Sequence, residues 1–106
     1  MDRILPDQQF TYRGTLGTSA ALLTPNSTYN AFAKQVILTN TSASDVTVTI
    51  TSAEGSPTTE AAIVVSSYDQ WVRSYDQGWE FTNGMKASAS SGSAVRVQIW
   101  GFQKST

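Results

Sequence analysis

The sequence contains neither cysteine nor histidine. Without cysteine, these 106 residues cannot form a disulfide framework or a thiolate metal site, so hydrophobic packing must stabilise the fold. Without histidine, the commonest general base and the usual zinc ligand are also missing. The two absences exclude most hydrolase and transferase designs, and we expect no catalytic residue, no cofactor and no metal.

Charge is also scarce. Charged residues make up 14% of the chain, and 7 Lys and Arg against 8 Asp and Glu give a formal net charge of -1. This balance creates no field that would attract polyphosphate, so we expect no nucleic-acid partner. Residues 1–6 lack the pattern of a secretory signal, and no apolar run approaches the ~20 residues that span a bilayer. We therefore expect a soluble protein that is made in the cytoplasm and does not contact a membrane.

Alternating apolar residues are abundant. Val46, Val48 and Ile50 alternate with threonines, which is the period of a half-buried strand. A second apolar run occupies residues 34–41, and the small polar residues that follow it predict a hairpin between the two strands. Near the C-terminus, residues 95–102 carry the aliphatic side chains of Val95, Val97 and Ile99 on one face and the aromatic ones of Trp100 and Phe102 on the other. This last strand is a candidate for cover on both faces.

Weaker strand patterns occur between the turn residues of the chain, at 9–16, 20–24, 61–66, 70–74 and 85–89. About eight short strands result, and the spacing of Gly, Pro, Asn and Ser between them is typical of a sandwich. The sequence therefore predicts an all-β, single-domain antiparallel β-sandwich of the jelly-roll type over residues 10–106. Residues 1–9 are predicted to form an extended N-terminal arm.

Aromatic residues are concentrated in a segment that also carries Gln, Asp and Arg73. They are Tyr68, Trp71, Tyr75, Trp79 and Phe81. An exposed set of this kind would stack on a sugar or anchor a protein interface. Strand alternation around Glu80 favours an interior position for Trp79 and Phe81, whereas Tyr68 and Tyr75 are the better surface candidates.

Two carboxylates in this segment, Asp69 and Asp76, raise the alternative of a glycosidase or a calcium site. Acid catalysis requires carboxyls with shifted pKa values in a deep cleft, which a sandwich of this length rarely encloses. Calcium would require a denser run of oxygen ligands. An enzyme is therefore the least favoured interpretation.

Two segments, 36–50 (VILTNTSASDVTVTI) and 85–99 (MKASASSGSAVRVQI), resemble a group of small tailed-phage virion proteins. These proteins share a hydrophobic strand ending in LTNTSAS, a Val/Thr strand and a closing KASAS…AVxVxI segment. The middle of the chain departs from the group, because the Tyr-Asp-Gln near-repeat replaces a Gly-rich turn. The resemblance implies a β-sandwich present in many copies on the virion, commonly as a homotrimer.

The role implied by this resemblance is a capsid decoration, or cement, protein that binds the major capsid protein or other virion proteins. A neck, tail or baseplate accessory protein is the alternative within the virion. A carbohydrate-binding or host-recognition module, or another assembly module, is the alternative outside it. We expect residues 1–9 to reach a neighbouring subunit, and the predicted partner-binding residues are Phe10, Tyr12, Tyr68, Trp71, Arg73 and Tyr75.

Overall fold

The computed structural model describes residues 8–25, 29–54 and 59–104. Among these residues there are strands and turns and no helix. The described part of the chain therefore contains no helix that is long and apolar enough to span a membrane. The strands are β1 (Gln8–Thr15), β2 (Ala21–Leu22), β3 (Asn30–Asn40), β4 (Val46–Ser52), β5 (Thr59–Val65), β6 (Gln70–Phe81), β7 (Met85–Ala89) and β8 (Val95–Lys104).

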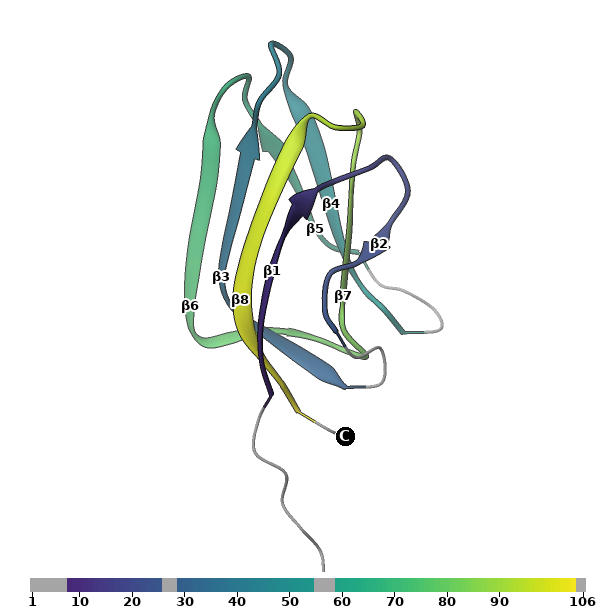
Figure 1. Ribbon diagram of the computed structural model, residues 1–106, viewed down its shortest axis with the longest axis vertical. Coiled ribbons are helices and arrows are strands. Elements are labelled where there is room, and N and C mark those ends of the chain that lie inside the picture. Colours follow the sequence, from purple (N-terminus) through teal and green to yellow (C-terminus); the bar gives the residue numbers. More distant parts are fainter. Residues whose placement is uncertain (1–7, 26–28, 55–58, 105–106) are drawn as a thin grey trace, which may run out of the picture.

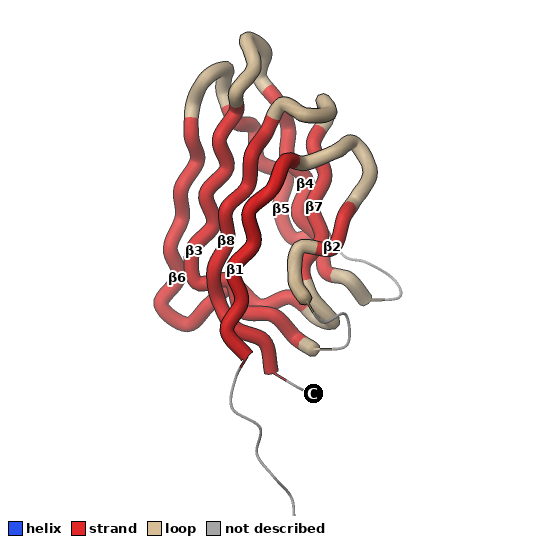
Figure 2. Tube along the Cα trace, viewed as in Figure 1, coloured by secondary structure: helices blue, strands red, loops and turns tan. Residues whose placement is uncertain are grey.

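The strands form two four-stranded sheets that face each other (Figures 1 and 2). Sheet A has the order β1-β8-β3-β6 and sheet B the order β2-β7-β4-β5, and every pair of neighbouring strands is antiparallel. This order is that of a jelly roll, in which each strand is followed by one in the other sheet, except that β4 is followed by its neighbour β5 in sheet B. The predicted fold class is thereby confirmed, and Met85 to Ala89 is predicted to the residue.

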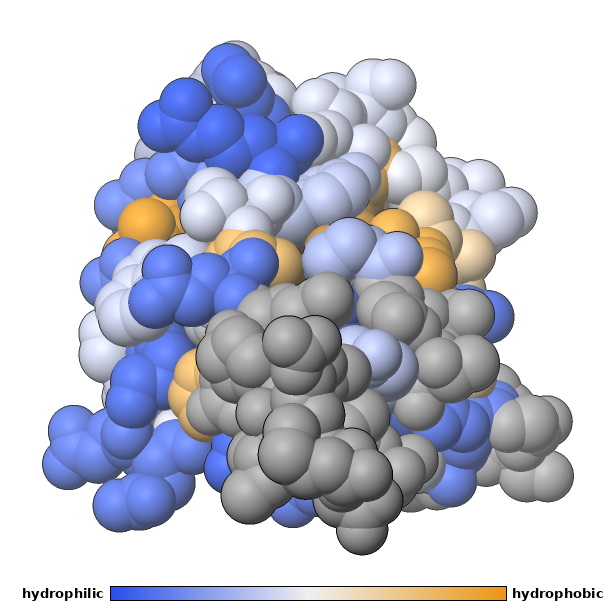
Figure 3. Space-filling view, turned by 60° about the horizontal axis from the view of Figure 1, so that its bottom comes forward, coloured by the Kyte–Doolittle hydropathy of each residue, from blue (hydrophilic) through white to orange (hydrophobic). Residues whose placement is uncertain are grey.

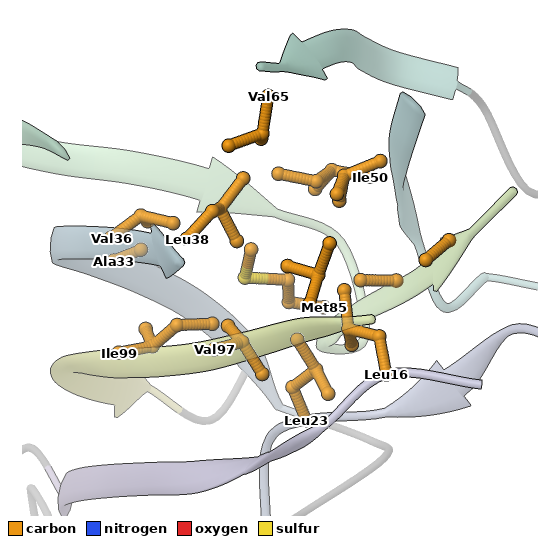
Figure 4. Packing of buried hydrophobic residues seen from close by; sticks show 14 of the residues in the cluster. Leu16, Leu23, Ala33, Val36, Leu38, Ile50, Val65, Met85, Val97 and Ile99 are labelled. Atoms are coloured by element: carbon orange, nitrogen blue, oxygen red, sulfur yellow. The ribbon is translucent and has the colours of Figure 1, made fainter. Parts of the chain in front are cut away.

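The core lies between the sheets because each long strand turns its aliphatic side chains inward with a period of two. Figure 4 shows these side chains pointing toward one another from both sheets. The buried residues include Ala33, Val36, Leu38, Val95, Val97 and Ile99 of sheet A, and Val46, Val48, Ile50, Val65, Met85 and Ala87 of sheet B. Threonines 47, 49 and 51 alternate with this set, as predicted for the second strand.

The predicted hairpin between residues 34–41 and 45–52 is wrong. β3 pairs with β6 and β8 in sheet A, whereas β4 pairs with β5 and β7 in sheet B. The connection at 41–45 therefore crosses from one sheet to the other. Period-two alternation fixes which side of a strand is buried, but it does not fix which strand lies beside it.

β6 is longer than the predicted strand at 70–74, because it continues past an irregularity to Phe81. The register against β3 passes from Gln35↔Ser74 directly to Ala33↔Trp79, so residues 75–78 form a bulge on β6. Gly78 has a positive φ of 84°, which permits the bend. The Nζ of Lys34 donates a hydrogen bond to the backbone oxygen of Asp76 and fastens the bulge.

The start of the chain differs slightly from the prediction. Gln8 and Gln9 pair with Gln103 and Phe102, so the last two residues of the predicted arm belong to β1. The rest of the arm, residues 1–7, lies outside the described residues.

A close approach between β3 and β8 requires glycine at position 101. β3 carries an extra residue between Ala33 and Gln35, opposite the step from Gly101 to Trp100. This bulge brings the Phe32 carbonyl oxygen to 2.0 Å from the position that a Cβ on Gly101 would occupy. No side chain at position 101 is compatible with this backbone.

Replacing Gly101 by Ala should therefore destabilise the fold by about 3 kcal/mol, because the neighbouring strand must move to accept the methyl group. Gly17→Ala is the matched control, since a Cβ there meets no atom within 4 Å; it should stay within about 0.5 kcal/mol of the wild type. Urea unfolding of both variants measures the difference. Equal effects would contradict the close approach.

Candidate interaction surfaces

An apolar patch lies on the outer face of sheet A, where a solvated sandwich would carry polar side chains. The register places Trp100 beside Gln35, Ile37 beside Val72, and Phe32 beside Phe102. These residues come from three neighbouring strands and point away from the core. We call Phe32, Ile37, Val72, Trp100 and Phe102 the outer-face patch.

The side chains of the outer-face patch are accessible to a partner. Trp100 is 49% exposed and Val72 is 48% exposed. The rings of Phe32 and Phe102 stack with centroids 5.0 Å apart, and the Lys104 ammonium lies over both. Apolar side chains gathered on an outer sheet face in this way are typical of an interaction site.

Polar pairs border the outer-face patch. Gln70 donates to Thr39 at 3.0 Å, and Gln35 donates to Ser74 at 3.3 Å. By the strand alternation Arg13, Arg96, Lys104 and Glu80 also belong to this face. An apolar centre with a polar border is the usual layout of a protein interface. In the space-filling view, hydrophobic surface emerges between hydrophilic side chains at separate places (Figure 3).

The aromatic segment identified in the sequence divides between three environments. Phe81 is completely buried and Trp79 is half-buried against the core, as the alternation around Glu80 predicts. Trp71 is also half-buried against the core, with the Arg73 guanidinium 5.4 Å from its ring centroid. Tyr75 was predicted to lie on the surface but packs at 5.4 Å on Trp79. Only Tyr68, 73% exposed, stands clear of the sandwich.

Burial changes the chemistry of Tyr75. Desolvation raises the pKa of its phenol above the ordinary value, and the nearby Arg73 guanidinium lowers it to a smaller extent. The neutral phenol is thus favoured in the folded state. This row of Trp71, Tyr75, Trp79 and Phe81 is mainly a packing element along the edge strand β6.

Tyr68 sits at one end of the sandwich, where four loops gather (upper end of Figure 1). The loops comprise residues 16–20, 41–45, 66–69 and 90–94, and we call them the loop end. About half of their residues are Ser or Thr, Tyr68 is their single aromatic residue, and Asp45 and Asp69 are their only charges. About a third of the Ser and Thr residues of the chain therefore lie in these four loops.

Hydrogen bonds tie the loops of this end to one another. The N–H of Tyr68 donates to the Ser42 oxygen at 3.1 Å, and the N–H of Thr41 donates to the Ala94 oxygen at 2.8 Å. Ser93 donates through its N–H to the Leu16 oxygen at 3.2 Å. The loop end is consequently a connected surface, and the backbone of Tyr68 is bonded to it.

The backbone of Tyr68 is strained. Its φ is +56°, a left-handed value that is uncommon for bulky side chains. The N–H of Asp69 donates to the Ser66 oxygen at 3.0 Å, so Tyr68 occupies the third position of a tight turn, where Gly or Asn is usual when φ is positive. Strain of this kind is concentrated at functional sites.

The two N-terminal candidates, Phe10 and Tyr12, face the core. Phe10 is 6% exposed, so its ring stabilises the sandwich and offers little surface to a partner. Tyr12 packs partly against the core and lines an open groove of about 270 Å³. We call this the edge groove, because it lies where β1 and β2 form the edges of their sheets; its lining is Thr11, Tyr12, Leu22, Leu23, Thr24 and Pro25.

Sequence reasoning identified part of these surfaces. It placed Trp100 and Phe102 on the face opposite the aliphatic residues of the last strand. It missed Phe32, Ile37 and Val72, because the strand pairing that gathers them is not visible in any one segment. In the described part of the chain, no group of three or more Asp and Glu side chains could hold a metal ion.

Comparisons with known proteins support the fold but identify no family. No protein-family model and no curated protein matches the sequence. Among solved structures, the chain is similar to a protein from work entitled "Bacillus endospore appendages form a novel family of disulfide-linked pili". The TM-score is 0.52 at 11% identity, over 99% of this chain and 95% of that one. At such low identity, the likeness concerns the fold alone.

The raised pKa of Tyr75 predicts a pH effect on stability. A phenol that is harder to ionise in the folded state contributes stability below the unfolded pKa of about 10, and this contribution is lost as the pH rises further. Tyr75→Phe should therefore show a shallower loss of stability between about pH 9.5 and 11. Tyr68→Phe, which removes an exposed phenol, is the matched control. Chemical denaturation across this range measures both, and identical alkaline slopes for the wild type and Tyr75→Phe would refute the prediction.

Proposed function

We propose that this chain is a non-catalytic structural subunit that docks on a repetitive protein surface through the outer-face patch. The observation that carries the proposal is the exposure of Trp100 and Val72 on a sheet face that a free sandwich would fill with polar groups. Burying such a patch removes apolar area from water at roughly 25 cal/mol per Å². Hydrogen bonds from its polar border would fix the orientation of the subunit on the partner surface.

We propose a tailed-phage virion as the assembly, with capsid decoration as the role. The resemblance of residues 36–50 and 85–99 to small virion proteins supports this choice, as does the low charge of the chain. A subunit that bridges capsomers only in the intact shell favours that shell by mass action. The major capsid protein would then be the partner, and a neck or tail position remains the alternative within the virion.

A pilus-like filament is a second candidate, favoured by the structural similarity to the endospore appendage protein. The disulfide linkage named for that family cannot form within these 106 residues, because they contain no cysteine. A filament built from this chain would depend on non-covalent contacts. Carbohydrate binding at Trp100, beside the Gln35 amide, is the candidate from another class.

Replacing Trp100 and Val72 by Thr should weaken binding to purified particles that lack the protein by at least about tenfold, because central aromatic anchors dominate interface energies. Threonine preserves the strand, so the melting temperature should change little. The reference variant is Val64→Thr, which alters a side chain that is 62% exposed and belongs to sheet B. Co-sedimentation with particles measures binding.

Undiminished binding of Trp100→Thr and Val72→Thr would overturn the docking role of the outer-face patch. A copy number in the hundreds on particles supports decoration, whereas a handful supports a neck or tail position. An oligosaccharide array that binds the wild type but not Trp100→Thr would support the carbohydrate alternative.

The N-terminal arm gives an independent test of attachment. Because β1 starts at Gln8, a deletion of residues 1–7 leaves every strand of the described residues intact. If the arm reaches a neighbouring subunit, the deletion should lower particle attachment about tenfold without changing the melting temperature of the isolated protein. Full attachment of the shortened chain would exclude this role.

A further inference from the structure

We infer that copies of this chain bind one another head to tail, with Tyr68 at the loop end of one copy inserted into the edge groove of the next. This inference rests on the proposed function in one respect, because a subunit of a repetitive assembly meets other copies of itself at high density. It concerns surfaces separate from the outer-face patch, so each is tested by its own variants.

The protruding partner in this contact is Tyr68. Its ring is 73% exposed, and its strained turn is held by bonds from Tyr68 N–H to Ser42 and from Asn40 N–H to Asp69. A fixed tyrosine surrounded by serines is typical of protein-binding loops, since it provides a large contact area with few rotatable bonds. A tyrosine at a turn position that suits glycine indicates that its ring makes a contact outside the chain.

The receiving partner is the edge groove. β2 has only two residues, so the sandwich is poorly covered at this edge, and Leu22 is 36% exposed. Cavities of about 150 Å³ accommodate a benzene ring. The groove, at about 270 Å³ and lined by Leu22, Leu23 and Pro25, is therefore large enough for one phenol.

Charge complementarity favours this pairing. Two exposed carboxylates, Asp45 and Asp69, lie in the loops that carry Tyr68, and each also accepts a backbone N–H bond. A cation lies beside the groove, because Lys86 is the register partner of Leu22, which lines it. Opposite charges around an apolar contact steer encounter and fix orientation.

Topology prevents one chain from making this contact with itself. Tyr68 lies between β5 and β6, which are the outermost strands at one edge of the two sheets. The groove lies at β1 and β2, which are the outermost strands at the opposite edge. The contact is therefore heterologous, and repetition closes a ring, such as a trimer, or extends a filament.

A complementation experiment tests the inference. Tyr68→Asn removes the ring with a residue that tolerates positive φ, and Leu22→Glu places a carboxylate in the groove opposite the acidic loops. Sedimentation velocity at roughly 0.1–1 mM suits a small interface. The wild type should form trimers or longer species, and each variant alone should be monomeric. An equimolar mixture of the two variants should form a 1:1 dimer, because Leu22→Glu retains an intact loop end and Tyr68→Asn retains an intact groove.

The controls separate this contact from folding and from the proposed function. Tyr68→Asn should melt at the same temperature as the wild type or higher, because strain is relieved, whereas a merely structural tyrosine would lower it. Trp100→Thr and Val64→Thr should associate as the wild type does. A monomeric wild type, association of either single variant, or a monomeric mixture would overturn the inference. Loss of association in Trp100→Thr alone would assign self-contact to the outer-face patch instead.

Discussion

The side chain of Asn40 joins the two sheets at the end that carries Tyr68. Its Nδ2 donates to the Ser44 oxygen at 2.8 Å and to the Val65 oxygen at 2.9 Å, and its Oδ1 accepts from the N–H and hydroxyl of Ser42. The amide is 1% exposed, so every one of these bonds offsets a desolvation cost. Asn40 ends β3 in sheet A and Val65 ends β5 in sheet B, so this amide connects the two sheets at this end. Ser42, which donates to the amide, also accepts the N–H of Tyr68.

Away from the Asn40 side chain, the alternation of inward and outward residues along each strand organises the sandwich. Aliphatic residues on both inner faces fill the core, and Gly101 lets β3 and β8 approach where β3 is bulged. The same alternation leaves each outer face to the remaining residues. On sheet B these include the threonines of β4, whereas on sheet A they include Trp100 and Val72. The two outer faces therefore differ, although sheet B also exposes one aliphatic side chain, Val64, beside Thr47.

The sequence predicted local features well and long-range ones poorly. Strand positions and the inner face of residues 95–101 follow from the two-residue period of apolar side chains. The hairpin error and the missed members of the outer-face patch have one cause. Pairing between strands far apart in the chain is decided by the packing of two sheets, which no single segment records. The edge groove was missed for the same reason, because β1 and β2 meet only through the fold.

The two proposed contacts have different mechanical consequences. A sandwich that docks only through an outer face can cover a surface, but neighbouring copies then do not reinforce one another. An edge contact between copies adds such reinforcement, because each additional bond forms within an assembly that is already held and so at a high effective concentration. Weak single contacts are sufficient under these conditions. Such an assembly would suit a small domain with few charges and modest patches, because many copies together would supply the affinity that one copy lacks.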